Sequence, residues 1–437
     1  MEGAAGEFKL DHMKRRIAIC IAAVTICTTI QASGQAQPTS KRPEDAGFSS
    51  ERLKRIAQVF QSDVAKGEIP GAVLAIGRNG SVPYLQAFGY QDRAKKTPMK
   101  ADSIFRIASM SKPITSVAIM MLAEEGKIDI GAPVSQYLPE FKDLKVGIQE
   151  PETQNRAMTV QDLLRHTSGL TYGFFGNSPV DQAYVKANLF DRSQTLAGMV
   201  TKLSKLPLAH QPGAVWEYSM STDVLGRIVE VASGMDFDRF IRERITQPLK
   251  MADTAFYVTA QQADRMAEPQ MEPATGQRPA TVPPIQAFSN EPVWMSGGGG
   301  LVSTASDYAR FCQMLLNGGE LDGVRLLSPR TVALMTSDHL PPGIRRAPGI
   351  VSALGELAPT PEMGQGFGLG FAVRTQAGRN PLPGSVGDFF WAGITGTYFW
   401  VDPKEKLFAV LMIQVPFGQT NHYFRIAREM VYQALIR

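Results

Sequence analysis

Residues 105–113, FRIASMSKP, place a hydroxyl and an amine one helical turn apart, at Ser109 and Lys112. Because residues at i and i+3 share one face of a helix, the Lys112 amine can reach the Ser109 hydroxyl. Pro113 follows directly, and a proline is harmless only in the first turn of a helix, where its missing N–H has no partner to lose. We therefore predict that a helix begins here, with Ser109 at its start, where unpaired main-chain N–H groups can stabilise an oxyanion.

The segment behind Pro113, ITSVAIMMLAEEG, is apolar on almost every side. This pattern is typical of a helix that the rest of the protein surrounds, and Gly126 is expected to end it. A second helix is predicted from the pair Thr304 and Asp307, which has the spacing of an N-terminal capping motif.

Strands are predicted near both ends of the chain, with helical segments and loops rich in proline and glycine between them. An Asn-Gly turn joins the first two strands as a hairpin, after a helix over residues 49–67. The fold class is therefore α/β (α+β), with an antiparallel sheet built from both chain ends, flanked by helices, and a mostly helical insertion. The predicted strands lie within residues 71–90, 366–374, 396–403 and 407–415, before a helix at 422–435.

The N-terminus has the pattern of an export signal. A basic trio, Lys14-Arg15-Arg16, precedes the apolar run IAICIAAVTICTTI, and small residues follow. The run has 14 residues, whereas a membrane-spanning helix needs about 20. We expect a periplasmic or secreted bacterial protein without a stable membrane anchor after cleavage, although a buried N-terminal helix stays open. The predicted segments are a vector-derived leader at 1–12, a signal peptide at 13–36, the N-terminal part of the α/β domain with the Ser109 helix at 37–130, a helical inserted domain at 131–300 and the C-terminal part of the α/β domain at 301–437.

Tyr218, in PGAVWEYSMSTDVLG, is the candidate partner of Ser109 and Lys112. It stands just before a predicted helix whose N-cap is expected at Ser221 or Thr222. A lysine can act as a base only if burial or a neighbouring cation lowers its pKa. Either Lys112 takes the Ser109 proton and Tyr218 relays it to the leaving group, or a tyrosinate is the base and the ammonium stabilises it. The sequence leaves both alternatives open.

Five ordered motifs together resemble the serine β-lactamase-like superfamily, which also contains penicillin-binding proteins. Within it, the chain is similar to the class C β-lactamase-related esterases, the family VIII carboxylesterases, over about residues 45–435. The motifs are Ser109-Met110-Ser111-Lys112, Tyr218-Ser219-Met220, MTVQDLLRHTSGL, SGGGGLVSTASDYARF and Trp391-Ala392-Gly393 before GTYFWVDP. The resemblance implies a β-lactamase-like fold, an acyl-enzyme on Ser109 and an oxyanion hole formed by the main-chain N–H groups of Ser109 and Ile394.

Two departures from the class C pattern bear on the substrate. Met220 stands at the asparagine position of Tyr-x-Asn, and Trp391 stands at the lysine position of Lys-Thr-Gly. In class C enzymes that lysine helps to hold a substrate carboxylate, so an apolar ring there favours an uncharged acyl group. We predict that Trp391, Gly393 and Met220 contact the substrate, although Trp391 can equally be core. Gly393 is expected to allow close main-chain approach on an edge strand.

The predicted function is a serine carboxylesterase acting on short-acyl-chain esters, with a side activity on cephalosporin-type β-lactams. A β-lactamase, a D-alanyl carboxypeptidase, a non-catalytic penicillin-binding sensor and an acyltransferase remain alternatives. No Gly-x-Ser-x-Gly string supports a Ser-His-Asp hydrolase, and His166 is interpreted as structural. We expect no cofactor and no metal, because no histidine has metal-ligand spacing. The net charge of +4 is not informative about partners, and no basic stripe suggests nucleic acid. The expected partner is a small-molecule ester or β-lactam substrate.

Overall fold

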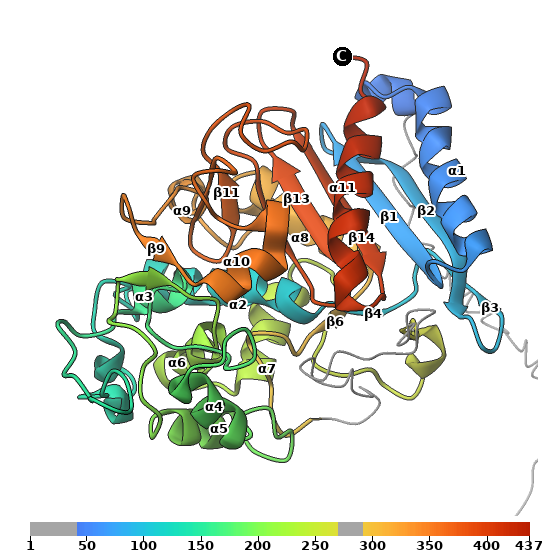
Figure 1. The fold of residues 1–437 in the computed structure, drawn as a ribbon. Coiled ribbons are helices and arrows are strands. Elements are labelled where there is room, and N and C mark those ends of the chain that lie inside the picture. Colours follow the sequence, from blue (N-terminus) through green and yellow to red (C-terminus); the bar gives the residue numbers. More distant parts are fainter. Residues whose placement is uncertain (1–41, 270–291) are drawn as a thin grey trace, which may run out of the picture. The chain divides into compact units, whose positions relative to one another are not determined.

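The computed structural model describes residues 42–269 and 292–437 (Figure 1). Residues 40–437 form one compact unit. The predicted leader at 1–12 and signal peptide at 13–36 lie outside the described residues. In the described ranges, no helix is both long and apolar enough to cross a membrane.

An antiparallel sheet of eight strands, in the order β10-β11-β12-β13-β14-β1-β2-β3, joins both ends of the chain. The two ends of the chain meet where β1 pairs with β14, and Ala72 lies opposite Ile413 in this pairing. The predicted fold class, with a sheet assembled from the two chain ends, is therefore confirmed. The strands are β1 Gly71–Arg78, β2 Ser81–Asp92, β3 Thr97–Pro98, β10 Gln365–Phe367, β11 Ala372–Arg374, β12 Phe389–Ala392, β13 Tyr398–Asp402 and β14 Leu407–Ile413.

Three short two-stranded pairings complete the strands of the described residues. They are β4 Phe105–Arg106 with β6 Val302–Ser303, β5 Val215–Trp216 with β9 Arg345–Arg346, and β7 Glu320–Leu321 with β8 Val324–Arg325. The pairing of β4 with β6 helps to position Ser109, because β4 leads directly into the segment that carries this residue.

Turn residues explain where the sheet agrees with the sequence and where it does not. Asn79 and Gly80 have φ angles of 50° and 73°, as the tight turn of the predicted β1-β2 hairpin requires. The segment 366–374 is not one strand as predicted, because Gly370, with a φ of 100°, turns the chain between β10 and β11. A side chain at Gly370 would collide with Ser116, so the turn packs closely against the helix that carries Ser116.

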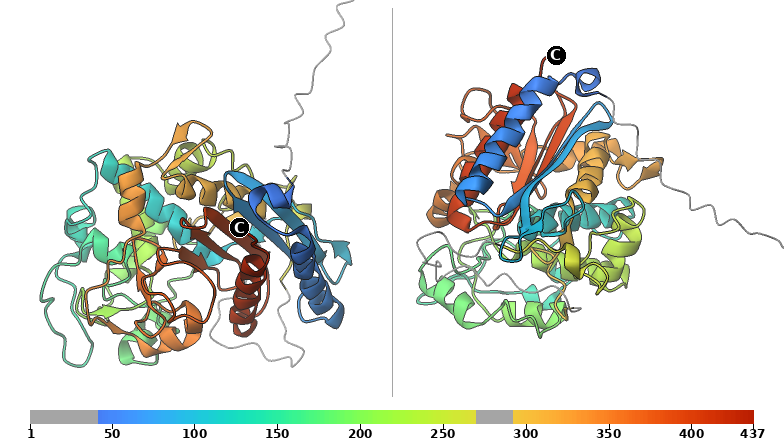
Figure 2. Two further views of the ribbon diagram at one scale, coloured as in Figure 1. Left: turned by 90° about the horizontal axis from the view of Figure 1, so that it is seen from above. Right: turned by 90° about the vertical axis from the view of Figure 1, so that its right-hand side faces the viewer.

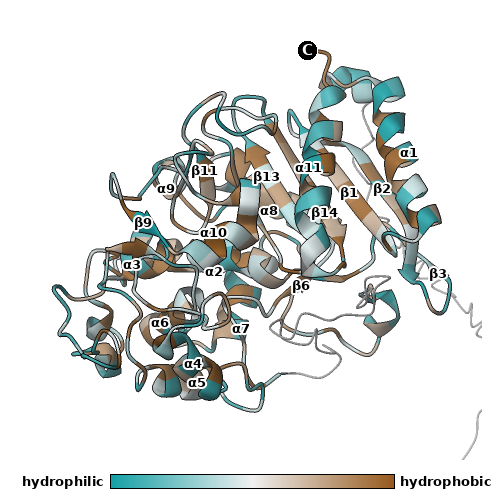
Figure 3. Ribbon diagram, in the orientation of Figure 1, coloured by the Kyte–Doolittle hydropathy of each residue, from teal (hydrophilic) through white to brown (hydrophobic). Residues whose placement is uncertain are grey.

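Helices cover both faces of the sheet. On one face, α1 and α11 lie side by side (Figures 1 and 2), and on the other α8 packs against β1, β13 and β14. Figure 3 shows apolar residues along the central strands and hydrophilic residues on the outward side of α1. The prediction placed the start of α11 five residues late, because its first turn, which follows Pro416, is polar. These helices are α1 Ser50–Lys66, α8 Ala305–Leu316 and α11 Phe417–Gln433.

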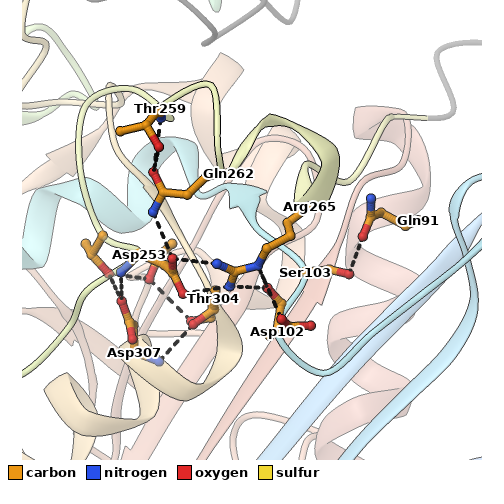
Figure 4. Close-up of polar contacts among 11 residues, drawn as sticks. Gln91, Asp102, Ser103, Asp253, Thr259, Gln262, Arg265, Thr304 and Asp307 are labelled. Atoms are coloured by element: carbon orange, nitrogen blue, oxygen red, sulfur yellow. Dashed lines mark hydrogen bonds and ion pairs between the residues drawn. The ribbon is translucent and has the colours of Figure 1, made fainter. Parts of the chain in front are cut away.

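Of the two reciprocal hydrogen bonds of the capping motif predicted for α8, one is formed. Thr304 Oγ1 accepts the Asp307 N–H at 3.1 Å. The Asp307 carboxylate instead accepts the Asp253 N–H and the Thr254 hydroxyl (Figure 4). The start of α8 therefore also anchors the segment that precedes residues 270–291.

The buried helix α2, Ser111–Glu124, lies between the sheet and the helices α6 and α7. Its side chains are buried from Ser111 to Leu122, as predicted from its apolar pattern. It packs against α6 and α7. The division of the chain at residues 130 and 300 stays a prediction. The other helices are α3 Val160–Leu164, α4 Pro179–Lys186, α5 Leu196–Leu203, α6 Ser221–Ser233, α7 Phe237–Ile241, α9 Pro329–Met335 and α10 Pro348–Leu354.

Candidate active site

The Ser109 segment is a strained turn that leads into α2. Ser109 is the middle residue of the short 3-10 turn Ala108–Met110, and α2 begins at Ser111. Ala108 has a φ of 45°, a left-handed conformation that is costly for a residue with a side chain. Pro113 is the third residue of α2, so its missing N–H costs no helical hydrogen bond. The predicted helix start is confirmed.

Lys112 reaches Ser109 from the buried first turn of α2. Its Nζ lies 3.2 Å from Ser109 Oγ and donates to the main-chain oxygen of Gly298 at 2.5 Å. The side chain is buried, and this burial lowers the pKa of Lys112 from 10.5 to about 7, against an opposing effect of the nearby Asp223. Around neutral pH, a substantial fraction of the amine is therefore unprotonated and can accept a proton from Ser109.

Tyr218 lies on the other side of the same amine. Its ring centroid is 4.6 Å from Lys112 Nζ, and its hydroxyl accepts the indole N–H of Trp391 at 3.2 Å. Burial raises the pKa of Tyr218 well above its usual range, and hydrogen bonding to Ser109 and Trp391 offsets this only in part. The phenol is therefore neutral, and of the two alternatives for the base these shifts favour the Lys112 amine.

The helix after Tyr218 starts differently from the prediction. Its N-cap is Met220, without a side-chain hydrogen bond, and α6 begins at Ser221. The predicted caps were wrong because Ser221 Oγ bonds to the hydroxyls of Ser168 and Ser219 instead of to the helix terminus. This hydroxyl cluster fixes the loop that carries Tyr218.

The segment after β12 forms the wall opposite Ser109. Ile394 lines the same cavity as Ser109. Its main-chain N–H has no hydrogen-bond acceptor among the described residues. A side chain at Gly393 would lie 2.6 Å from the main-chain oxygen of Ile107, so only glycine permits this close approach. The expectation of an edge strand was wrong, because β12 pairs with β11 and β13 on its two sides. The oxyanion-hole assignment stays a prediction.

A cavity of about 230 Å³ contains Ser109 and Tyr218. Trp391 is 2% exposed and also lines the cavity, so it belongs both to the core and to the wall. Met220 is fully buried and is not among the described residues of the lining, so the structure gives it no place against a substrate. One wall is aromatic, with Tyr172, Phe174, Phe175, Phe190 and Trp294, and another is formed by Ile350, Ala353, Leu354, Leu357 and Phe424.

Sequence reasoning missed Asp223 as part of the site. This carboxylate is buried on α6 and accepts the Ser296 hydroxyl at 2.5 Å and the Gly298 N–H at 3.2 Å. Gly298 thus donates its main-chain N–H to Asp223 and accepts from Lys112 at its main-chain oxygen. The motif SGGGG was noted in the sequence, but an acid in the first turn of a helix is usually a cap, so Asp223 gave no separate signal.

The imidazole ring of His166 packs against the ring of Tyr218. The two ring centroids lie 4.8 Å apart, and His166 also contacts the rings of Trp216 and Phe367. Burial and the nearby Lys112 charge hold the pKa of His166 well below its ordinary value, so its imidazole is neutral. These contacts agree with the structural role predicted for it.

Comparisons with known proteins agree with this architecture. A profile of the family described as Beta-lactamase matches residues 56–429. Esterase EstB of Burkholderia gladioli is 30% identical over 399 residues, which are 86% of this chain and 94% of that protein. A Salmonella agona protein, provisionally named a D-alanyl-D-alanine carboxypeptidase, is 26% identical over 421 residues and 90% of each chain. The solved structure of EstCE1, described as a hydrolase with promiscuous acyltransferase activity, has a TM-score of 0.74 at 29% identity and covers 87% of this chain and 99% of its own.

Proposed function

Because the chain belongs to the Beta-lactamase family and is a serine hydrolase of that superfamily, we propose that it is a carboxylesterase that hydrolyses short-acyl-chain esters through an acyl-enzyme on Ser109. The observation that carries this proposal is the contact of Ser109, Lys112 and Tyr218 beside a cavity whose wall carries the neutral indole of Trp391. The similarity to esterase EstB and to EstCE1 supports it.

Acylation begins at the short contact between Ser109 and Lys112. The unprotonated Lys112 amine accepts the Ser109 proton while Ser109 Oγ bonds to the ester carbonyl carbon. The carbonyl oxygen becomes an oxyanion, and the main-chain N–H groups of Ser109 and Ile394 are the donors that would stabilise it.

Collapse of this intermediate breaks the bond to the alcohol. The leaving oxygen takes the Tyr218 proton, and Tyr218 recovers one from the Lys112 ammonium, so charge and protons balance. The hydrogen bond from Trp391 holds the Tyr218 hydroxyl in place for this relay. A water molecule then attacks the acyl-enzyme by the same steps in reverse order and releases the acid and Ser109.

The cavity favours apolar, uncharged groups next to the scissile bond. Five aromatic side chains form one wall, and the indole of Trp391 stands where class C enzymes have a lysine. Burying apolar substrate surface there is favourable, whereas a carboxylate beside Trp391 would lack a cation. This weighs against efficient β-lactamase or D-alanyl carboxypeptidase action, although the Salmonella agona relative keeps the latter as the second candidate.

The test is a substrate panel on one preparation of the protein. We expect p-nitrophenyl acetate and butyrate to be hydrolysed faster than a cephalosporin or a D-Ala-D-Ala peptide. Ser109→Ala should abolish ester hydrolysis, with Ser233→Ala, at the C-terminal end of α6 and outside the cavity lining, as the matched control. Full activity in Ser109→Ala would refute the acyl-enzyme, and a single burst without turnover would favour the penicillin-binding sensor.

We also propose that the protein is exported. The basic trio at 14–16 and the apolar run behind it support a cleaved signal peptide at 13–36. N-terminal sequencing of the protein from a periplasmic fraction should give a chain that starts at residue 37. A cytoplasmic protein that retains residues 13–36 would refute export.

A further inference from the structure

The aromatic wall of the cavity is a continuous cluster of ring contacts that starts at Tyr218. The ring of Tyr172 lies 5.3 Å from that of Tyr218, measured between centroids. Tyr172 stacks on Phe174 at 5.1 Å and on Phe190 at 6.0 Å, with interplanar angles of 22° and 27°. Phe190 in turn contacts the indole of Trp294 at 5.9 Å. A substrate group beside Tyr218 therefore lies against aromatic side chains.

The rings of this wall differ in how much of their surface is accessible. Tyr172 and Trp294 are buried, whereas Phe174, Phe175 and Phe190 are half-buried. Because these three rings line the cavity, accessible aromatic surface faces the space in which a substrate binds. The wall thus offers ring faces and ring edges to a ligand.

The mutual orientation of the rings suits a third ring. Phe174 and Phe190 are inclined to each other by 49°, with centroids 5.8 Å apart. A substrate ring that stacks on one of them is therefore tilted against the other. Aromatic pairs favour offset-stacked and edge-to-face contacts at centroid distances of roughly 4.5–7 Å, because each ring has a negative face and a positive edge. A saturated ring of the same size lacks this charge distribution, so the wall can distinguish an aryl group from an alkyl group.

The second wall of the cavity has mostly aliphatic side chains. Ile350, Ala353 and Leu354 have the i, i+3, i+4 spacing of residues on one face of a helix, here α10. Leu357 lies just after this helix, and Phe424 of α11 is the one aromatic member. This wall favours the burial of an alkyl group.

The two walls meet at a close main-chain contact. A side chain at Gly349, in the first turn of α10, would lie 1.8 Å from the main-chain oxygen of Phe175. The start of α10 is therefore packed against the segment that carries the aromatic wall. The ring of Phe175 also contacts that of Tyr218, at 6.4 Å. The cavity is thus pre-organised between two walls of different chemistry, which lowers the entropy cost of binding.

We propose that the aromatic wall is an aryl-binding subsite, and that the substrate is an ester with an aryl group on one side of the scissile bond and a short alkyl group on the other. This inference rests on the esterase function proposed above and names the substrate class of the same site. The aryl group packs against Phe174 and Phe190, and the alkyl group lies along α10. The aryl group can belong to the alcohol or to the acyl group, and the experiment distinguishes these two sources.

The test compares two pairs of esters that differ only in a phenyl or a cyclohexyl ring. For the acyl side, p-nitrophenyl 3-phenylpropanoate is compared with p-nitrophenyl 3-cyclohexylpropanoate. For the alcohol side, 2-phenylethyl butyrate is compared with 2-cyclohexylethyl butyrate. The cyclohexyl ring has at least as much apolar surface, so burial alone gives no preference for phenyl. In one of the pairs we expect kcat/KM of the phenyl ester to exceed that of its cyclohexyl partner by roughly fivefold or more.

Phe190→Leu and Phe174→Leu each remove one ring but keep an apolar side chain, so each should bring the phenyl-to-cyclohexyl ratio closer to one. Phe190→Tyr retains a ring and should retain most of the ratio. The matched control is Tyr90→Leu, which removes an exposed ring of β2 outside the cavity lining and should keep the wild-type ratio.

A ratio of one or below in both pairs for the wild-type protein would overturn the aryl-binding subsite. A ratio that stays unchanged in both Phe190→Leu and Phe174→Leu, or that is lost in Tyr90→Leu, would overturn it as well. Failure of the esterase function is recognised separately, because the wild-type protein would then not turn over p-nitrophenyl butyrate, or Ser109→Ala would retain that turnover.

Discussion

The carboxylate of Asp223 is expected to set the pH at which the site becomes active. Asp223 and Lys112 both bind the main chain of Gly298, with 3.2 Å from Gly298 N to the carboxylate and 2.5 Å from Gly298 O to the amine. Asp223→Asn keeps a carbonyl oxygen for the Gly298 N–H and the Ser296 hydroxyl but removes the negative charge. The substitution therefore changes the electrostatics with little change of shape.

The size of the effect follows from the separation of the charges. With the main-chain atoms of one residue between them, the two charges are roughly 6–9 Å apart, and at an effective dielectric constant of about 20 they attract each other by about 2 kcal/mol. Burial raises the pKa of Asp223 and thus opposes its negative charge, whereas the nearby Lys112 and the hydrogen bonds from Ser296 and Gly298 favour it. We therefore expect the midpoint of the pH profile to move by about one pH unit.

The direction follows from the role proposed for Lys112. A base must be unprotonated, so kcat/KM of the wild-type protein should rise with pH around the Lys112 pKa of about 7 and then level off. Without the nearby anion, the ammonium is less stable, its pKa falls and the rise moves to lower pH. The assay is kcat/KM for p-nitrophenyl butyrate from roughly pH 5 to pH 9.

The control is Asp307→Asn, which removes a buried carboxylate at the start of α8, outside the cavity lining. It should keep the wild-type midpoint. A midpoint that stays fixed or moves to higher pH in Asp223→Asn would refute the coupling of Asp223 to Lys112. A wild-type midpoint far above neutral pH would refute Lys112 as the base and indicate the Tyr218 phenolate.

Two further substitutions test the surroundings of these groups. Trp391→Phe removes the hydrogen bond to the Tyr218 hydroxyl, so we expect kcat to fall about tenfold with a smaller change in KM. An unchanged kcat in steady-state assays would contradict a positioning role for the indole. Lys112→Met should be inactive but more stable than the wild type by about 1–3 kcal/mol at pH 7 in denaturant unfolding. The folded state depresses the Lys112 pKa from 10.5 to about 7, so the stability of the wild type is fully present above the unfolded value and falls as pH decreases towards the folded one. The gap between the two proteins should therefore shrink above neutral pH, and an equal gap at all pH values would contradict this linkage.

Local sequence signals predicted most of the fold. The helix α1, the β1-β2 hairpin and the buried helix α2 follow from apolar spacing and turn residues, which act over a few positions. The single strand predicted at 366–374 was wrong because the turn at Gly370 is packed against Ser116, which lies far away in the sequence. The start of α11 was missed because its polar first turn carries no apolar period.

Only the site residues that belong to short sequence motifs could be predicted from the sequence. Ser109, Lys112 and Tyr218 belong to short patterns, and the structure brings all three into contact. Asp223 carries no such pattern. It reaches Lys112 because α6 packs against α2, which depends on tertiary packing.

The neutral residue at position 391 affects the choice of base as well as the choice of substrate. A cation beside the Tyr218 hydroxyl would favour the phenolate, because opposite charges at short range stabilise the ionised form. The indole of Trp391 offers only a neutral N–H at 3.2 Å, while burial keeps the phenol protonated. The same burial removes water from Lys112 and lowers its pKa, so the amine is the group that can exchange a proton near neutral pH. We therefore expect the neutral indole of Trp391 to disfavour both a carboxylate at this wall and a phenolate at Tyr218, in agreement with the proposal of Lys112 as the base.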